Sequence, residues 1–583
     1  MTEKQDERGL LLRIDGKEIT AGVDDSLLAL VKKLNLDTTD LKTRPLAASI
    51  AGEVFTLNYV PVREEGRESQ RIILRRALRA AKGEVKLIRY DYKRGQRIYE
   101  RTLLFVFLLA MHELYPGVQV RVNYAVGAGL LASCENMKID EKAVMDIRKR
   151  MHSIVQADYK LERRRLDIED AIDHFSLDGQ VDKVRLLTWR RFSYFDVYQH
   201  GEYVDYFYGE MAPSTGYLSV FDVQIHTLGL MLLRPAALNP NTPALIEWKP
   251  KLTAAFEESE KWGQLMRCDV VADLNDMVKN GEIRALIRVN EALHEKRFAE
   301  LANEIIARKT RAVFIAGPSS SGKTTSANRL CTQLRIHGKS PVLLSLDDYY
   351  LDRESVIPDE NGEIDLEHIR MIDTDLFRDN LSELLHGKTV ELPRFDFRTQ
   401  QRTWTGHTLH VDEDTPLVIE GLHALNPALF PNSVDCSMIF RLYVSALTTL
   451  NLDNHNRIPT TELRLLRRMV RDHETRGMSV ERTLSMWSSV RRGEECWIFP
   501  YQEDADAFFN STLVYEPAVL KKHIFPLLND VQPESEFFDD VRAIVKFLNY
   551  FLEANVEDEI PPTSILREFI GGNTFYRDET AGR

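Results

Sequence analysis

A chain of 583 residues is too long for a single hydrophobic core, which predicts three or four domains of roughly 100 to 200 residues each. A hydrophobic fraction of 44% with 28% charged residues is typical of a soluble globular protein, and a formal net charge of -13 argues against general attraction to nucleic acid or anionic membranes. The scattered cysteines, the polar N-terminus and a longest apolar run (Leu103 to Met111) of about half the length of a membrane span favour a cytoplasmic protein without a membrane segment.

The N-terminal residues have the pattern of a small α+β unit. Leu10 to Thr20 predicts two short strands around the turn Asp15-Gly16, and 27–33 is apolar at helical spacing. A second block follows from residue 70 to 235, with helical patterns at 103–114 and 141–160. Its expected strand, 217–226, alternates apolar and polar residues, so this block should form a core of its own.

The second half of the chain begins with a charged helical stretch, 283–309, which lacks Gly and Pro and is expected to be a connecting helix. From Arg311 the order of strand, glycine-containing loop and helix is typical of a parallel α/β domain. An amphipathic helix is expected near the C-terminus, with its apolar positions between Val541 and Leu552.

The most specific motif is the loop Gly317-Pro-Ser-Ser-Ser-Gly-Lys323-Thr324, between an expected strand at 312–316 and an expected helix at 325–337. The glycines let successive backbone N–H groups turn toward one point, and the helix presents its positive end there. Lys323 supplies a charge for the β and γ phosphates, and Thr324 a hydroxyl for Mg²⁺. The loop predicts nucleotide binding but leaves the reaction open.

Two further expected strands end in carboxylates, at Asp347 and at Glu420. In parallel α/β sheets ligands bind at the carboxyl ends of strands, so both should lie beside the phosphate loop. Asp347 is suited to accept the proton of an attacking hydroxyl or, alternatively, to act as a Mg²⁺–water ligand. Glu420 is suited to hold Mg²⁺.

A helix rich in arginine is expected from Arg464 to Gly477. Its arginines could fold over the nucleotide and stabilise charge on the moving phosphoryl group. Alternatively, they could form an ordinary solvated face.

In this order the motifs resemble the uridine kinase and phosphoribulokinase family of P-loop kinases. Besides the loop, the resemblance rests on Leu346-Asp-Asp-Tyr-Tyr350, Glu391 to Phe397, Ile419-Glu-Gly421 and the arginine helix. It implies ATP- and Mg²⁺-dependent phosphorylation of a nucleoside 5′-hydroxyl. The implied ATP-binding residues are Gly317, Ser319, Ser320, Ser321, Gly322, Lys323, Thr324 and Thr325.

The resemblance also assigns roles by position. Asp347 would be the catalytic base, and Lys323 with the lid residues Arg471 and Arg476 would neutralise phosphoryl charge. Thr324 and Glu420 would hold the metal. The implied nucleoside pocket comprises Asp347, Tyr350, Glu367, Phe395 and Asp396. His368-Ile-Arg370 replaces the family's His-Pro-Asp, which leaves the base preference open.

The front half resembles two other domains. Residues 9–62 resemble a TGS domain, and 70–235 resemble the second additional domain of threonyl-tRNA synthetases through motifs at 113–117, 147–154 and 209–215. The positions matching that domain's metal-binding editing residues are Arg101, Phe105, Phe207 and Met211. None is a good imidazole or thiolate ligand, so no metal and no editing chemistry are expected.

The predicted fold is therefore a multidomain α/β and α+β chain. It consists of a β-grasp TGS-like domain (9–62), a synthetase-like α+β domain (70–235), the connecting helix (283–309), a P-loop kinase domain (310–530) with a parallel sheet, and a C-terminal helical extension (531–583). This order resembles the long nucleoside kinases, as do the motifs His423-Ala-Leu-Asn426, Asn456-Arg-Ile-Pro459 and Arg492-Gly-Glu-Glu495, the last of which has no physical explanation from the sequence. The resemblance makes a homo-oligomer plausible.

Two alternatives to a nucleoside kinase remain. One is a kinase for another small hydroxyl compound such as a sugar phosphate, and the other is a regulatory or RNA-associated protein whose nucleotide site is a switch. A basic cluster, Arg148 to Arg150 with Arg163 to Arg165, could contact RNA, although a solvated helix face balanced by neighbouring acids is the favoured interpretation.

Overall fold

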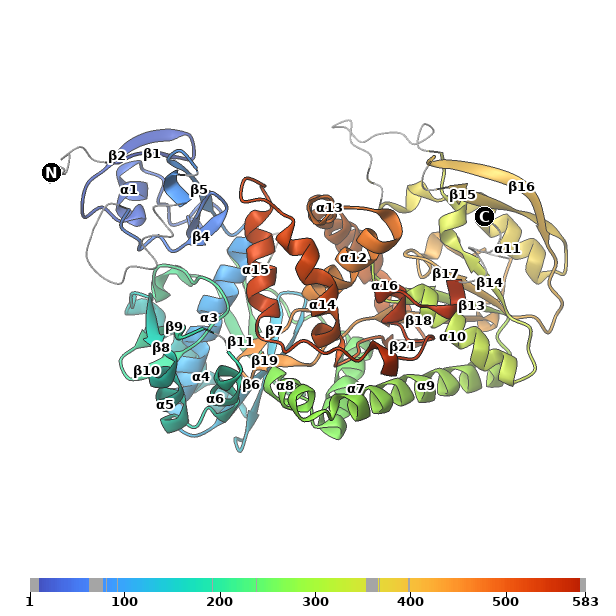
Figure 1. The fold of residues 1–583 in the computed structure, drawn as a ribbon, viewed down its shortest axis with the longest axis horizontal. Helices are drawn as coiled ribbons and strands as arrows, with labels where there is room; N and C mark the ends of the chain where they lie inside the picture. Colours follow the sequence, from blue (N-terminus) through green and yellow to red (C-terminus); the bar gives the residue numbers. More distant parts are fainter. Residues whose placement is uncertain are drawn as a thin grey trace. The chain divides into compact units, whose positions relative to one another are not determined.

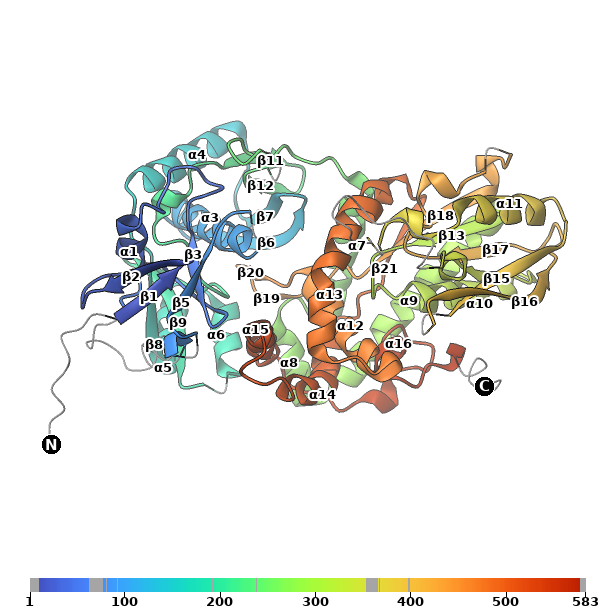
Figure 2. The ribbon, with the colours of Figure 1, turned by 90° about the horizontal axis from the view of Figure 1, so that it is seen from above.

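The structure is a computed structural model that describes residues 10–61, 77–79, 81–91, 93–190, 192–236, 239–352, 365, 367–396, 399–431 and 433–576. The chain divides into two compact units, drawn in Figure 1 and, after a quarter turn, in Figure 2. Unit 1 comprises Met1–Trp248, Asn451–Arg457 and Pro533–Lys546. Unit 2 comprises Lys249–Leu450, Ile458–Gln532 and Phe547–Arg583.

Unit 1 opens with a five-stranded sheet made of β1 (Leu10–Ile14), β2 (Lys17–Ala21), β3 (Ala47–Ile50), β4 (Glu53–Phe55) and β5 (Glu84–Ile88), with α1 (Leu27–Lys33) after the first hairpin. The strand order is β2-β1-β5-β3-β4, so a strand beyond residue 62 completes this sheet. The predicted hairpin and helix are confirmed, because β1 and β2 pair around Asp15 and Gly16 and the Ser26 hydroxyl caps α1.

The remainder of unit 1 surrounds α3 (Lys93–Leu114), which contains the apolar run Leu103 to Met111. All nine residues of that run are buried, so it is the core helix of this part of the unit. Among the described residues, no helix combines the length and the apolarity needed to cross a bilayer.

Two further sheets and several helices belong to the N-terminal segment of unit 1, Met1–Trp248. The four-stranded sheet has the order β11-β12-β7-β6, and the three-stranded sheet has the order β10-β9-β8. Their strands are β6 (Gln119–Val126), β7 (Gly129–Glu135), β8 (Glu162–Asp167), β9 (Tyr194–His200), β10 (Tyr203–Asp205), β11 (Asp222–His226) and β12 (Gly229–Leu233). The helices are α4 (Glu141–Gln156), α5 (Ile168–Leu177) and α6 (Val181–Thr188). The helix expected at 141–160 was predicted too long, because α4 ends at Gln156. The strand expected at 217–226 was also predicted too long, because a 3₁₀ turn at Thr215–Tyr217 comes first and β11 begins only at Asp222.

Unit 2 is built on a five-stranded parallel sheet in the order β14-β17-β13-β18-β21. Its strands are β13 (Ala312–Ala316), β14 (Val342–Ser345), β17 (Leu417–Glu420), β18 (Ile439–Ser445) and β21 (Ala507–Asn510). Every residue of β13 is buried, as expected for an apolar run in the centre of a parallel sheet. The predicted parallel α/β sheet is therefore confirmed.

Helices and a two-stranded ribbon surround this sheet. The ribbon pairs β15 (Val390–Asp396) with β16 (Gln401–Leu409). The helices are α7 (Pro250–Met266), α8 (Val271–Asn280), α9 (Ile283–Ala307), α10 (Lys323–Ile336), α11 (Thr374–Leu385), α12 (Thr460–Arg476), α13 (Val480–Gly493), α14 (Glu516–Asn529) and α16 (Arg567–Ile570). The helix expected at 283–309 is present as α9, which lies wholly within unit 2 and packs along α10 (Figure 1).

The end of the chain differs from the prediction. The amphipathic helix α15 (Phe538–Leu548) ends four residues before Leu552, and Phe551, which was expected on its apolar face, lies beyond the helix and is buried. The following segment continues through a short 3₁₀ turn and α16 to a second 3₁₀ turn at Thr574–Tyr576.

Candidate active site at the carboxyl edge of the parallel sheet

The phosphate loop leaves β13 and enters α10, as the sequence predicts. A side chain at Gly317 would have its Cβ 2.0 Å from the Val444 carbonyl oxygen, so only glycine fits there. Gly322 has a φ of +84°, which favours glycine, and precedes the first residue of α10. The N-terminal N–H groups of α10 therefore face the space enclosed by the loop, as in an anion-binding site.

Oxygen atoms gather beside the first turn of α10. The Thr324 hydroxyl donates to Glu420 Oε1 at 3.3 Å, and the Ser345 hydroxyl donates to the same oxygen at 3.2 Å. Burial, together with the nearby Asp347, raises the pKa of Glu420 to about 7. Hard oxygen donors, few in number and next to a phosphate site, fit Mg²⁺, which usually keeps several waters and phosphate oxygens as ligands.

Asp347 follows β14 and lies in the 3₁₀ turn Leu346–Tyr349, at the same sheet edge. Burial raises the pKa of its carboxyl group, and the positive charges of Lys323, Arg476 and Arg471 oppose that rise. Burial lowers the pKa of Lys323, against the attraction of Glu420 and Asp347. The structure thus brings together the predicted lysine, carboxylates and two arginines around one space.

Arg471 and Arg476 lie near the end of α12, which stops at Gly477 as predicted. Both approach the buried Asp472, with Nη–Oδ distances of 3.5 and 3.1 Å. The Arg476 side chain retains 46% of its exposure. Asp472 therefore holds the guanidinium groups of both arginines, and the Arg476 side chain is still partly exposed to solvent.

The other arginines of α12 have neither of the two expected roles, which were a cover over the nucleotide and a solvated helix face. Arg464, Arg467 and Arg468 are buried, so they form neither a solvated face nor a cover over a nucleotide. Arg464 donates to the Ser319 carbonyl at 3.0 Å, and Arg468 to the Ser319 hydroxyl at 2.8 Å. They hold the outer side of the phosphate loop in place.

Buried carboxylates balance these arginines. Glu494 accepts from Arg464 at 2.7 Å and also from the Ser319 backbone N–H at 3.1 Å. Glu516 accepts from Arg467 at 2.7 and 3.0 Å. Glu494 begins a π-helical turn, Glu494–Ile498, a feature common at functional sites. Sequence reasoning missed its role, although the motif Arg492-Gly-Glu-Glu had drawn attention without a physical explanation.

The predicted nucleoside-pocket residues are close to one another. The rings of Tyr350 and Phe395 are 5.5 Å apart between centroids, and burial raises the pKa of Tyr350, with Asp347 and Glu367 contributing. Burial also raises the pKa of Glu367 to about 7. Asp396 is the last residue of β15, next to Phe395. Aromatic faces and carboxylates therefore lie close to Asp347.

His423 is a second residue that sequence reasoning did not place in the site. It is 2% exposed, and its Nδ1 has no hydrogen-bond partner among the described residues. Burial lowers its pKa to about 4, so the ring is neutral near pH 7. Two sequence signals could have drawn attention to it: it follows Glu420 by three positions, and it begins the motif His423-Ala-Leu-Asn426, which resembles the long nucleoside kinases.

The basic cluster of unit 1 is a helix face only in part, because Arg148 to Arg150 lie on α4 whereas Arg163 to Arg165 lie on a strand. Arg163 and Arg165 lie on strand β8 and pair with the buried Asp196 at 2.8 Å. Arg163 also pairs with the buried Glu210 at 2.5 Å. These guanidinium groups are thus neutralised by acids from elsewhere in the unit rather than by their sequence neighbours.

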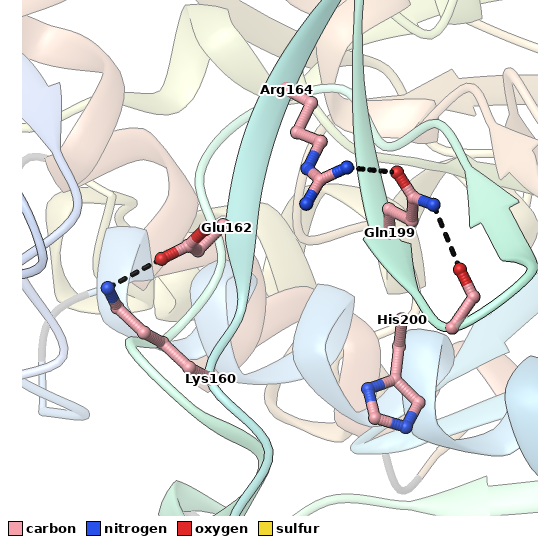
Figure 3. A pocket seen from close by; sticks show the side chains of 6 residues that line it. Lys160, Glu162, Arg164, Gln199 and His200 are labelled. Atoms are coloured by element: carbon pink, nitrogen blue, oxygen red, sulfur yellow. Dashed lines mark hydrogen bonds and ion pairs between the residues drawn. The ribbon is translucent and has the colours of Figure 1, made fainter. Parts of the chain in front are cut away.

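A polar cavity of about 380 Å³ adjoins the same strand (Figure 3). Lys160 pairs with Glu162 at 2.5 Å, and Arg164 donates to Gln199 at 2.8 Å. Its charged groups are exposed and mutually satisfied, so this cavity lacks the buried acid–base groups that mark the site of unit 2.

The four positions that resemble editing residues are occupied by a packed cluster. The Phe105 and Phe207 rings are 6.1 Å apart, and Met211 is 1% exposed. Arg101 Nε donates to the Glu210 carbonyl oxygen at 2.9 Å. Phe105, Phe207 and Met211 thus contribute to the core of unit 1, and Arg101 is half-buried beside them.

A phosphate loop and acidic strand ends on a parallel sheet define a P-loop kinase domain. The family described as "Phosphoribulokinase / Uridine kinase family" matches residues 312–515. A uridine kinase of Staphylococcus epidermidis is 32% identical over 199 residues, covering 34% of this chain and 86% of that protein. A uridine kinase of Staphylococcus aureus is 31% identical over 200 residues, with coverages of 34% and 86%. The chain belongs to the phosphoribulokinase/uridine kinase family.

A solved structure titled as a possible uridine kinase from Bacillus stearothermophilus is also similar. It has 20% sequence identity and a TM-score of 0.26, and the alignment covers 37% of this chain and 98% of that one.

Proposed function

We propose that the protein is an ATP- and Mg²⁺-dependent nucleoside kinase that transfers the γ-phosphoryl group to a nucleoside 5′-hydroxyl. The observation that carries this proposal is the position of Asp347, a half-buried carboxylate close to Lys323, Arg471 and Arg476. A base at the acceptor hydroxyl is needed for transfer to an alcohol, whereas a nucleotide switch does not need one.

In this proposal Asp347 accepts the hydroxyl proton at a carboxylate oxygen. Lys323 binds the phosphates of ATP, while Arg471 and Arg476 neutralise charge on the transferred group. Thr324 and Glu420 hold Mg²⁺, which supplies charge neutralisation at the β and γ phosphates. Arg464, Arg467 and Arg468, which hydrogen-bond to the loop and are named here the arginine brace, keep the buried loop in a fixed position. Such positioning is the main contribution of a protein to phosphoryl transfer.

The residues around Asp347 support a nucleoside as the phosphoryl acceptor. Tyr350 and Phe395 offer aromatic surface suitable for a base, and Glu367 offers a carboxylate suitable for sugar hydroxyls. A phosphorylated sugar would bring a second anionic group toward Asp347 and Glu367. The sequence similarity to uridine kinases agrees with this preference.

The test is ADP release by the purified full chain with ATP, Mg²⁺ and a panel of nucleosides and sugar phosphates. We expect nucleosides to stimulate release, Lys323→Ala to lose about 10²-fold or more of the rate, and the exposed control Lys388→Ala to retain it. Stimulation by sugar phosphates alone would replace the acceptor class. No stimulation by any acceptor, with ATP binding intact, would refute the kinase proposal.

A further inference from the structure

The segment Ser564 to Asn573, named here the tail segment, contacts the phosphate loop although it lies outside the family match at 312–515. The Thr325 hydroxyl donates to Glu568 Oε2 at 2.7 Å. Asn573 Nδ2 donates to the Thr325 hydroxyl oxygen at 3.3 Å. Ile565 covers Gly322 so closely that a Cβ there would lie 2.5 Å from Ile565 Cγ2.

The tail segment is anchored in the core of unit 2. Ile565, Leu566 and Phe569 are each 0% exposed. The Ser564 hydroxyl donates at 2.6 Å to Glu291 of α9, and Glu291 also accepts from Tyr515 at 2.8 Å. Burying these three apolar side chains stabilises the docked segment by several kcal/mol, at about 1.5–3 kcal/mol each. The contacts with Thr325 therefore come from a rigid part of the unit.

Thr325 lies in the first turn of α10, directly after the residue suited to hold Mg²⁺. Its side chain is 0% exposed, and its hydroxyl uses its proton toward Glu568 and a lone pair toward Asn573. A hydrogen bond to a carboxylate is about twice as strong as a neutral one. The orientation of this turn, whose N–H groups face the phosphate site, is thus set by the tail segment.

We propose that the tail segment is a constituent of the nucleotide site and that Glu568 is a positioning residue for ATP binding. Glu568 holds the Thr325 hydroxyl, and through it the first turn of α10, in the orientation that receives the phosphates. The inference rests on the proposed function only in taking ATP as the ligand of the loop. It does not depend on which acceptor is phosphorylated.

The test is the equilibrium affinity of the full chain for ATP with Mg²⁺, measured by titration calorimetry. Glu568→Ala leaves the Thr325 hydroxyl without its acceptor, and we expect affinity to fall about tenfold or more. Asn573→Ala removes the longer bond and should weaken affinity about threefold. Glu568→Gln keeps an acceptor oxygen, so its ATP affinity should stay within about threefold of that of the parent. The exposed control Glu553→Ala should have the same ATP affinity as the parent.

Thermal unfolding of each variant separates positioning from a merely structural role. Glu568→Ala with a lower unfolding midpoint but unchanged ATP affinity would overturn the proposal, as would absence of ATP binding by the parent chain. If Glu568→Ala does not fold, the ATP affinity of Asn573→Ala is the deciding measurement, and an affinity equal to that of the parent overturns the proposal. ATP binding without nucleoside phosphorylation refutes the proposed function alone. Phosphorylation with unaltered ATP affinity in Glu568→Ala and Asn573→Ala refutes this inference alone.

Discussion

At the scale of single residues, the proposed reaction depends on Asp347 as the base at the acceptor hydroxyl. Its carboxyl lies among three positive charges, yet it is not part of the loop that binds phosphates. Asp347→Asn keeps the shape but cannot accept a proton. We expect kcat to fall by about 10²–10⁴ while ATP affinity changes less than about threefold, measured by ADP release and calorimetry.

The exposed Asp375→Asn, on α11, is the control for this substitution and should behave like the parent. Loss of ATP affinity in parallel with kcat in Asp347→Asn would contradict the role of base and favour the alternative of a magnesium–water ligand.

Glu367 predicts a pH dependence of stability. Burial, with help from Glu494 and Asp365, raises its pKa from the ordinary value of 4.5 to about 7. The folded chain therefore binds this proton more tightly than the unfolded chain. The stabilisation is fully present below about pH 4.5 and is lost as pH rises through about 7.

Glu367→Gln removes the titration. Between pH 5 and pH 8 we expect its free energy of unfolding to gain about 1–3 kcal/mol relative to the parent, measured by urea denaturation at both values. The difference between the two proteins cancels other titrating groups. An equal offset at both pH values would show that Glu367 ionises normally in the folded protein.

At the scale of elements, α12 shows why a buried charged helix differs from a solvated one. The Arg467 side chain is fully buried, pairs with Glu516, and donates to the Ser511 and Ser320 carbonyls at 2.8 and 3.4 Å. Removing one partner of such a pair leaves an unbalanced buried charge.

Arg467→Ala should therefore destabilise unit 2 by about 3–5 kcal/mol, seen in urea denaturation. The exposed Arg482→Ala on α13 is its control. Because Arg467 also supports Ser320 in the loop, the folded fraction of Arg467→Ala should bind ATP more weakly. A loss of less than about 1 kcal/mol in the free energy of unfolding would mean that the Arg467–Glu516 pair stabilises the unit no more than a surface ion pair does.

The sequence was sufficient for elements whose signals are local. The buried strand β13, the loop and the start of α10 follow from residues within one short stretch, and the carboxylates of Asp347 and Glu420 follow from the rule of strand ends. The brace was not predictable in this way. Glu494 meets Arg464 across 30 residues and Ser319 across 175, and no local pattern encodes such pairings.

At the scale of the whole molecule, the chain leaves unit 2 for one short hairpin. β19 (Asn451–Asp453) and β20 (Asn456–Arg457) belong to unit 1, although the residues on both sides belong to unit 2. Within unit 1, Asn451 Nδ2 donates to the Val122 carbonyl at 2.7 Å, and Asn456 Nδ2 donates to the Tyr206 carbonyl at 2.9 Å. Asn456 belongs to the motif Asn456-Arg-Ile-Pro459, and this contact gives that motif a physical role.

A buried ionic network fixes the hairpin. Lys183 Nζ lies 2.9 Å from Asp205 and 3.7 Å from Asp453, and His455 Nδ1 lies 2.7 Å from Asp205. Both carboxylates are 0% exposed. Proximity to His455 and Lys183 lowers the pKa of Asp205, whereas burial raises that of Asp453. The central ammonium group thus balances two buried acids from distant parts of the sequence.

Lys183→Met keeps the length of the side chain but leaves both acids without this charge, so unit 1 should lose about 3–5 kcal/mol of stability. After β20 the chain runs through Pro459 directly into α12, which carries the arginine brace and Arg471. Release of the hairpin should therefore loosen the start of α12. In Lys183→Met, unit 1 should unfold at a lower temperature than in the parent, and kinase activity is expected to disappear at that same temperature. The exposed control Lys142→Met should lose activity at the same temperature as the parent. Activity that persists above the unfolding of unit 1, followed by circular dichroism and ADP release on the same samples, would show that unit 2 holds α12 without the hairpin.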